Sequence, residues 1–384
     1  MSFQTIFDFR CPTRLINGPG SIARLPEFFS KRHKVLVVTD KNLQAAGIVD
    51  QVTTVLKTAA IPYTVYDGVE TNPRARSVSS GLRQYEKEKC GAILGLGGGS
   101  PMDVAKMIGV LATNGGRIDH YLGLNKVEKD LPPLVCIPTT YGTGSEVTPF
   151  AVLTNPKTKN KDPVISWKIA PQVGILDPEL VTTLPAAVGA PTGMDALTHA
   201  LESYINLMAA PVTDGIAMQA IQLVGANIRL ACANDHEIQA TENMLIASAL
   251  AGIAFSQTRL GNVHAMSHPV GAYFDVHHGT ANAILLPYVM EFNLPARVEK
   301  FAHIAALLGA DTDDMTDYEA AHLAIETVWE LNGDLDIPET LGPVGVKASA
   351  ITPMSKAAMQ SGNIAVNPRK TAQRDIEQIF KNAL

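Results

Sequence analysis

The amino-acid sequence predicts an α/β N-terminal domain built on a mostly parallel sheet, followed by an all-α C-terminal domain. In the first half of the chain, short apolar runs alternate with helix-like segments, an order typical of a parallel sheet with helices on its faces. In the second half, strand-like runs fade and long segments rich in Ala, Leu and Met dominate. The change falls at residues 183–191, TLPAAVGAP, where prolines and a glycine mark a boundary. We therefore expect two domains, 1–184 and 185–384.

Four apolar runs predict the strands of the N-terminal sheet, because strands buried on both faces lack a polar alternation. These runs are Lys34–Thr39, Pro62–Tyr66, Ala92–Leu96 and Leu134–Ile137. Helices are expected between them, for example at Ser77–Lys89 and Met102–Thr113. The helices expected in the second domain are Thr192–Met208, Ala210–Cys232, Ala240–Ser256, Arg297–Leu308 and Tyr318–Asn332.

Composition and charge narrow the classes of partner. The 384 residues are 46% hydrophobic and 18% charged, and their formal net charge is −6. No block rich in Lys and Arg is present, so we expect neither a nucleic acid nor an anionic membrane as partner. The first residues do not resemble a secretory signal, and the apolar stretch Met244–Phe255 is too short to span a bilayer. Together with four scattered cysteines, these features predict a cytoplasmic protein.

A glycine-rich turn follows the third predicted strand. Residues 95–103 read GLGGGSPMD, with Ser100 as the expected helix cap and Pro101 as the expected first helical residue. Glycines let the backbone approach a phosphate, and a helix N-terminus favours an anion, so a cofactor with a diphosphate fits. Because Ser100 stands where the GxGxxG pattern has its third glycine, a purely structural turn is an equal alternative.

Asp40 and a hydroxyl-rich loop extend this predicted site. Asp40 follows the first predicted strand, where a carboxylate binds a ribose 2′-hydroxyl and repels a 2′-phosphate, which favours NAD over NADP. Asp40 also suits the N-cap of the next helix, and the two roles are compatible. Residues 138–146, PTTYGTGSE, follow the fourth predicted strand and offer hydroxyl groups that could line a cofactor.

Aspartate and histidine residues of the second domain predict a metal site. Asp195 and His199 lie four residues apart on a predicted helix and share one face, and His264 and His268 repeat this spacing. A His-His-Gly sequence follows at 277–279. Imidazoles with one carboxylate suit Zn²⁺ or Fe²⁺ better than Mg²⁺ or Ca²⁺. A single pair at this spacing is more often structural, but so many buried imidazoles need partners, and a metal ion provides one.

The chain resembles the iron-containing (group III) alcohol dehydrogenases over essentially its whole length. Four motifs carry the resemblance: 97–103, 138–146, 193–202 (GMDALTHALE) and 264–287 (HAMSHPVGAYFDVHHGTANAILLP). The resemblance implies an N-terminal domain that binds NAD, a helical domain that binds Fe²⁺ or Zn²⁺, and a homodimer or higher homo-oligomer. The metal ligands that it implies are Asp195, His199, His264 and His278. The dinucleotide contacts that it implies are Asp40, Asn72, Gly98, Gly99, Ser100, Thr139, Thr140, Thr143 and Lys161.

These features together predict an NAD-dependent alcohol dehydrogenase that transfers a hydride between NAD and a primary alcohol or small diol, the aldehyde being the oxidised partner. His268 is the candidate proton relay, and His277 is a second candidate; alternatively, either side chain supports the ligands or faces solvent. The alternative function is a metal-dependent hydrolase or lyase, in which Glu202 or Glu146 acts as base on a metal-bound water. That alternative leaves the glycine-rich turn without a role.

Overall fold

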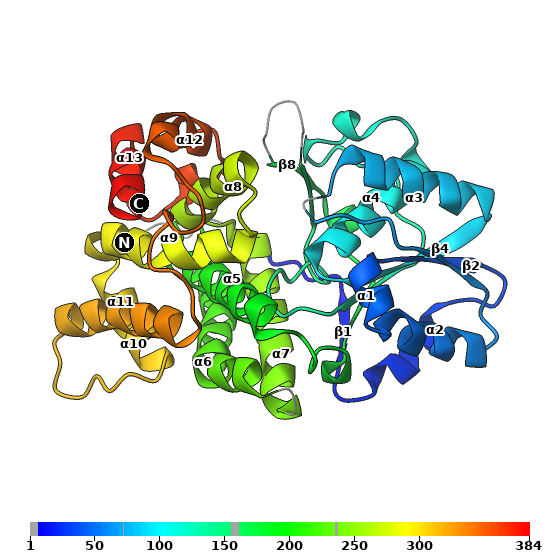
Figure 1. Ribbon diagram of the computed structural model, residues 1–384, viewed down its shortest axis with the longest axis horizontal. Helices are drawn as coiled ribbons and strands as arrows, with labels where there is room; N and C mark the ends of the chain where they lie inside the picture. Colours follow the sequence, from blue (N-terminus) through cyan, green and yellow to red (C-terminus); the bar gives the residue numbers. More distant parts are fainter. Residues whose placement is uncertain (1–6, 72, 155–160, 235–236) are drawn as a thin grey trace. The chain divides into compact units, whose positions relative to one another are not determined.

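The computed structural model describes residues 7–71, 73–154, 161–234 and 237–384, which belong to two compact units (Figure 1). The first, called the α/β unit below, consists of the described residues within 12–185 and 234–249. The second, the helical unit, consists of the described residues within 7–11, 186–233 and 250–384.

Six parallel strands form the main sheet of the α/β unit. They are β1 (Arg14–Asn17), β2 (Lys34–Val38), β3 (Tyr63–Tyr66), β4 (Cys90–Gly97), β6 (Leu134–Pro138) and β9 (Val173–Leu176). Their spatial order is β1-β9-β6-β4-β2-β3, and each neighbouring pair is parallel. The chain adds β3 on one side of β2 and then places β4 and β6 on the other, so the direction of strand addition reverses between β2 and β4. In open α/β sheets, ligands bind beside the carboxyl ends of strands at such a reversal.

The predicted mostly parallel sheet is confirmed, and the four predicted strands coincide with β2, β3, β4 and β6 to within two residues at each end. The strands β1 and β9 were not predicted from the sequence. Neither was a small second sheet of β5 (Gly123–Leu124), β7 (Phe150–Thr154) and β8 (Lys161–Ile165). In that sheet β7 and β8 are antiparallel, whereas β5 and β8 are parallel.

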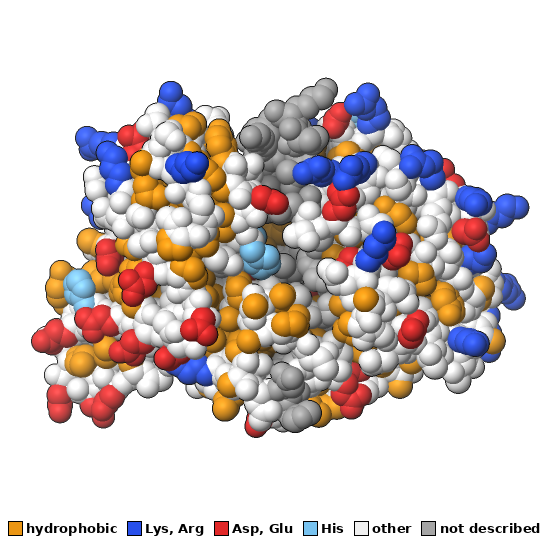
Figure 2. All heavy atoms as spheres, viewed as in Figure 1, with side chains coloured by type: hydrophobic (Ala, Val, Ile, Leu, Met, Phe, Trp, Pro, Cys, Tyr) orange, Lys and Arg blue, Asp and Glu red, His pale blue; other side chains and the backbone are white. Residues whose placement is uncertain are grey.

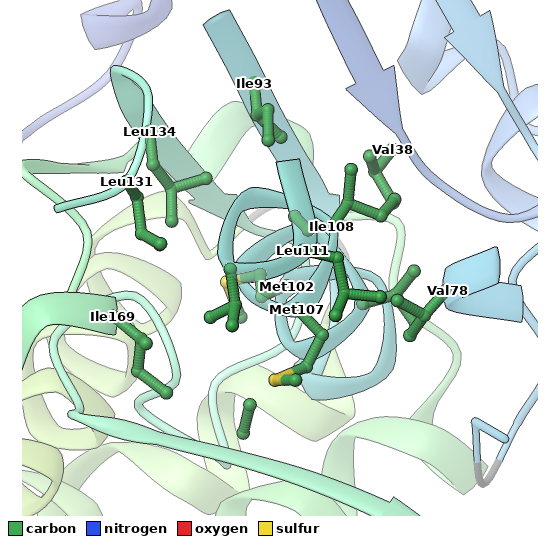
Figure 3. Close-up of a cluster of buried hydrophobic side chains, with 14 of the residues drawn as sticks. Val38, Val78, Ile93, Met102, Met107, Ile108, Leu111, Leu131, Leu134 and Ile169 are labelled. Carbon is green, nitrogen blue, oxygen red and sulfur yellow. The ribbon is translucent and has the colours of Figure 1, made fainter. Parts of the chain in front are cut away.

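Helices cover both sides of the main sheet. In Figure 1, α3 (Ala75–Lys87) and α4 (Gly99–Asn114) lie on one side of β2 and β4, and α2 (Ile48–Thr58) lies on the other. Figure 3 shows the core around α4, whose Met102, Met107, Ile108 and Leu111 lie among apolar side chains of the strands and of α3. The remaining helices of this unit are α1 (Lys41–Ala45), η1 (Ser21–Phe28), η2 (Ile118–His120), η3 (Trp167–Ile169) and η4 (Pro178–Leu180), together with the first half of α7.

The helical unit contains no strand among its described residues, which confirms the all-α prediction. Its α-helices are α5 (Ala186–Ile205), α6 (Pro211–Ala233), the second half of α7 (Ile238–Thr258), α8 (Asn262–Phe274), α9 (His278–Asn293), α10 (Val298–Leu307), α11 (Asp317–Asp334), α12 (Ile351–Ala358) and α13 (Gln373–Asn382). Its short 3-10 helices are η5 (Leu294–Ala296), η6 (Ala348–Ala350) and η7 (Ile364–Val366). Helix α5 packs against α6 and α9, and α8 packs against α9 and α12.

Helix α5 begins earlier than its sequence predicts. The segment 183–191 is punctuated by glycine and proline, but α5 starts at Ala186 and includes both Gly189 and Pro191. From Gly189 to Ile205 every residue of this helix is buried. The burial of that surface stabilises the helix and overrides the weak helix propensity of its first turns.

Two helices, α6 and α7, are long and apolar enough to cross a membrane by length and composition alone. The predicted stretch Met244–Phe255 lies within the 21 residues of α7, so the helix is longer than the apolar run that the sequence displays. In the most apolar 18-residue window of each helix, 61% of the residues are buried in α7 and 33% in α6. Buried core helices pass the same test, so the finding is weak evidence for a membrane. Figure 2 shows acidic and basic side chains mixed on the right of the visible face and mostly acidic side chains at its lower left.

Candidate active site

Two of the predicted metal ligands lie on the buried face of α5. Asp195 and His199 are four residues apart and therefore lie one above the other on the helix. Only 3% of Asp195 and 5% of His199 is exposed. The His199 ring stacks on Phe255 of α7, with ring centroids 4.5 Å apart. This apolar neighbour keeps water from one face of the imidazole.

Helices α8 and α9 bring two further histidines to the same carboxylate oxygen. Oδ1 of Asp195 lies 3.8 Å from Nε2 of His199, 3.6 Å from Nε2 of His264 and 3.8 Å from Nε2 of His278. Ligand atoms of Asp195, His199 and His264 all lie within 4.8 Å of one another. Asp195, His199 and His264 thus form a compact group of candidate ligands, and His278 also lies near the carboxylate of Asp195.

These separations suit a metal ion better than direct hydrogen bonds. At 3.6–3.8 Å, the carboxylate and the imidazole nitrogens are too far apart to bond to each other. Ligands held about 2.0–2.2 Å from a tetrahedral ion are roughly 3.3–3.6 Å apart, which is close to the observed spacing. The donor set of three imidazoles and one carboxylate also fits Zn²⁺ or Fe²⁺.

The charges around this cluster favour a cation. Burial alone raises the pKa of Asp195, but the imidazoles of His199, His278 and His264 outweigh it and hold that pKa well below its usual range. Burial alone lowers the pKa of His264, but the carboxylates of Glu202 and Asp195 raise it to about 9. Positive charge at this position is therefore stabilised by its surroundings, and a divalent ion supplies such charge.

A close approach between α5 and α9 places His278 at the site. The next residue is Gly279, and a Cβ built on it would stand 2.7 Å from the carbonyl carbon of Pro191. Ordinary carbon–carbon contacts are about 3.5–4.0 Å, so only glycine allows the first turn of α9 to approach α5 this closely. Gly279 therefore lets the first turn of α9, which carries His278, approach α5.

Asn282 was not predicted from the sequence, although it contacts three of the predicted ligands. Its Nδ2 donates to Oδ1 of Asp195 at 2.6 Å and lies 3.1 and 3.2 Å from Nε2 of His264 and His278. The side chain is fully buried, and its Oδ1 has no hydrogen-bond partner among the described residues. Asn282 thus contacts three of the four predicted ligands, Asp195, His264 and His278. The signal in the sequence is spacing, since Asn282 lies four residues after His278 on α9.

The two proposed relay histidines occupy different environments. The half-buried His268 lies on α8, with its ring centroid 5.3 Å from that of His278 and 6.3 Å from that of His264. His277 is exposed and is the N-cap of α9. The structure therefore places His268 beside the ligand cluster, with part of its surface in contact with solvent.

In the α/β unit, Asp40 and the glycine-rich turn, both predicted to contact the cofactor, lie at the strand reversal. Asp40 follows β2 and the glycine-rich turn follows β4, and these two strands are neighbours. The Oδ1 atom of Asp40 accepts hydrogen bonds from the backbone N–H groups of Asn42 and Leu43, at 2.9 and 3.2 Å. The N-cap interpretation of Asp40 is thus correct, and its location at the reversal is compatible with a second role toward a ribose.

The glycine-rich turn differs in detail from its prediction. Helix α4 begins at Gly99 with Gly98 as N-cap, so Ser100 is the second helical residue and not the cap, and Pro101 is the third. The earlier start follows from Gly97, whose φ of 145° closes the turn in a region that favours glycine. Both Gly98 and Gly99 lie close to the next loop, because a Cβ on them would stand 3.3 Å from Oγ1 of Thr140 and 2.9 Å from Cγ2 of Thr143, respectively.

The structure describes only some of the remaining predicted cofactor contacts. Thr139 is buried beside the turn, where its backbone N–H donates to the carbonyl of Gly97 at 3.1 Å. Asn72 lies outside the described residues. Lys161 begins β8, and only its backbone is described.

A buried lysine that the sequence analysis overlooked joins α4 to the hydroxyl-rich loop. Lys106 is fully buried, and its Nζ donates to Oγ of Ser145 at 2.9 Å and to the carbonyls of Thr148 and Phe150 at 3.0 and 2.7 Å. Asp103 accepts from the same Ser145 hydroxyl at 2.8 Å. These bonds fix the position of the loop that follows β6 relative to helix α4. The sequence carries a signal for this contact, because Asp103 and Lys106 lie three residues apart in an otherwise apolar helix.

Comparison with known proteins decides the family. Residues 12–178 match the iron-containing alcohol dehydrogenase family, and residues 189–384 match the C-terminal domain of the Fe-containing alcohol dehydrogenase family. The chain belongs to the iron-containing alcohol dehydrogenases. It is an oxidoreductase acting on alcohols, as predicted.

Several relatives of this dehydrogenase span its full length. The 1,3-propanediol dehydrogenase of Citrobacter freundii is 45% identical over 100% of both chains. The NAD-dependent methanol dehydrogenase of Bacillus methanolicus is 40% identical, over 98% of this chain and 100% of the relative. The crystal structure of a 1,3-propanediol oxidoreductase superposes with a TM-score of 0.95 at 44% identity, covering 99% of this chain and 100% of that one.

The hydrolase or lyase alternative is not supported by these relatives. The structure also gives a physical reason why Glu202 does not act as a base on a metal-bound water. Both of its carboxylate oxygens are engaged, one with the Nδ1 edge of His264 and one with a backbone N–H, and Nδ1 is on the opposite side of that ring from the ligand cluster. Glu146 lies buried in the α/β unit, where burial raises its pKa to about 7.

Proposed function

We propose that this dehydrogenase oxidises small primary alcohols or diols with NAD and reduces the corresponding aldehydes, using one Fe²⁺ or Zn²⁺ held by Asp195, His199, His264 and His278. The observation that carries the proposal is the convergence of three imidazole Nε2 atoms on one oxygen of Asp195 at 3.6–3.8 Å. A divalent ion at this point supplies the charge that makes an alcohol hydroxyl more acidic, and NAD supplies the hydride acceptor.

The substrate class is inferred from the relatives and from the walls of the site. The relatives named above act on 1,3-propanediol and methanol, both of which are small primary alcohols. Phe255 stacks on His199 and provides an apolar surface next to the donor cluster. We therefore propose substrates of a few carbon atoms, like those named for these relatives.

The cofactor is assigned to the strand reversal of the α/β unit. We propose that Gly98, Gly99 and Ser100 present backbone N–H groups of the α4 N-terminus to the diphosphate. The nearby hydroxyl-rich loop would add Thr139, Thr140 and Thr143. Asp40 at the end of β2 would accept a ribose hydroxyl and disfavour a 2′-phosphate, which selects NAD. Asn72 and Lys161 remain candidate contacts on the basis of the resemblance.

We propose that His268 carries the proton between the site and solvent, because it is half-buried and lies beside His264 and His278. The exposed His277 is the weaker candidate for this role. A cytoplasmic location and a homodimer or higher homo-oligomer are also proposed; light scattering after size-exclusion chromatography tests the assembly.

The experiment that tests the proposed function uses protein purified without oxygen and loaded with Fe²⁺ or Zn²⁺. NADH formation at 340 nm should follow addition of NAD and 1,3-propanediol, with a lower rate for NADP. Asp195→Ala should lose bound metal and activity but retain NAD binding, since Asp195 lies in the helical unit and the predicted NAD contacts lie in the α/β unit. Full activity of metal-free Asp195→Ala protein would refute the proposed site.

A further inference from the structure

Glu202 joins two of the helices that form the metal cluster. It lies on α5, seven residues after Asp195 and three after His199, and 3% of it is exposed. Its Oε2 lies 2.6 Å from Nδ1 of His264 on α8. Its Oε1 accepts a hydrogen bond from the backbone N–H of Val263, also at 2.6 Å.

These two contacts act on the same ligand in different ways. An N–H donated from Nδ1 of His264 to the carboxylate leaves the lone pair of Nε2 directed at the cluster, because a neutral imidazole has one donor and one acceptor nitrogen. The bond to Val263 satisfies one of the N–H groups at the N-terminus of α8, which would otherwise lack a partner. Glu202 therefore controls both the ring orientation of His264 and the end of the helix that carries it.

We propose that Glu202 is a positioning residue that sets the metal affinity of the site through His264. The inference rests on the proposed metal site. Helix α5 then supplies two ligands, Asp195 and His199, and orients a third. Residues of this kind around metal-bound histidines typically alter metal affinity by 10–100-fold when they are replaced.

The competing explanation is that Glu202 merely caps α8. Asn367 distinguishes the two explanations, because its Oδ1 accepts from the backbone N–H of Asn262 at 3.2 Å, at the same helix end. Asn367→Ala therefore weakens the cap without removing the acceptor that faces the ring of His264. A second control is Glu146→Gln, which neutralises a buried glutamate of the α/β unit.

The decisive variant is Glu202→Gln. Glutamine has almost the same shape as glutamate but only one acceptor oxygen. If that oxygen accepts from the backbone N–H of Val263, the NH₂ group faces Nδ1 of His264 and donates to it. His264 then accepts at Nδ1 and carries its proton on Nε2, where the metal would bind. The variant thus keeps the cap and reverses the hydrogen bond to the ring.

The affinity of the full-length apoprotein for Zn²⁺ is measured by competition with a chromogenic chelator, with folding checked by circular dichroism. We expect 10–100-fold weaker binding for Glu202→Gln and less than threefold changes for both controls. Wild-type affinity in Glu202→Gln, or an equal loss in Asn367→Ala, would overturn the proposal. If Glu202→Gln does not fold, Glu202→Asp is tested instead, because the shorter aspartate side chain cannot reach the ring of His264. Wild-type Zn²⁺ affinity in Glu202→Asp would then refute the inference. Failure of the wild-type protein itself to bind Zn²⁺ would instead refute the proposed metal site.

Discussion

Gly279→Ala tests whether the approach of α9 to α5 determines the metal site. The added Cβ would stand 2.7 Å from the carbonyl carbon of Pro191, where ordinary contacts are about 3.5–4.0 Å. The clash involves backbone on both sides, so it cannot be relieved by rotating a side chain. The first turn of α9, including His278, must therefore move by about 1 Å.

Two consequences follow from that displacement. Metal–ligand distances vary by only about 0.2 Å, so a shift of about 1 Å removes His278 as an effective ligand. We expect Zn²⁺ binding to weaken at least about tenfold, which corresponds to ~1.4 kcal/mol. Overpacking a core costs about 1–3 kcal/mol, which lowers Tm by roughly 2–4 °C per kcal/mol in a domain of this size.

The assay combines chelator competition with thermal unfolding of the apoprotein. The matched control is Gly215→Ala on α6, where a built Cβ meets nothing within 4 Å. Because alanine favours a helix over glycine by up to about 1 kcal/mol, this control should keep its metal affinity and gain slightly in Tm. Unchanged affinity and Tm in Gly279→Ala would refute the argument that the close approach places His278.

Three further predictions concern a half-buried histidine and two buried charged residues. His268→Ala should retain its metal but lower kcat and alter its pH profile, because the proposed proton path is lost; an unchanged profile would exclude His268 as the relay. Lys106→Met should lower the free energy of unfolding by about 3–5 kcal/mol, since it leaves buried acceptors such as Ser145 without their donor; a loss below about 1 kcal/mol in denaturant unfolding would contradict this. Burial raises the pKa of Glu146 to about 7 from an ordinary 4.5, so the folded state holds this proton more tightly and loses stability as pH rises from about 4.5 through 7. Glu146→Gln should therefore stabilise the protein above pH 7, by up to roughly 3 kcal/mol, and have little effect below pH 4.5; an equal effect at both pH values would refute this.

The predictions from the sequence succeeded where the signal is local. Asp195 and His199 could be assigned to one helix face because the period of a helix is about 3.6 residues, and β2 and β4 because buried strands are continuous apolar runs. The edge strand β1 and its neighbour β9 were not predicted, because each is placed by pairing with segments far away in the chain. The N-cap of α4 was misplaced by two residues, because the positive φ of Gly97 depends on the turn as a whole.

The remaining features depend on contacts between distant parts of the chain. Glu202 and His264 are separated by 62 residues, and Asp195 and Asn282 by 87, and no local pattern states that these side chains meet. Residue types and spacing therefore determined the family, the fold class and the candidate donors. The resemblance had already selected His278, whereas only the packing of α5, α8 and α9 decided that Glu202 stands behind His264 and that Gly279 must lack a side chain. The reason is physical: a helix determines which side chains share its face, whereas close packing between helices determines which faces meet.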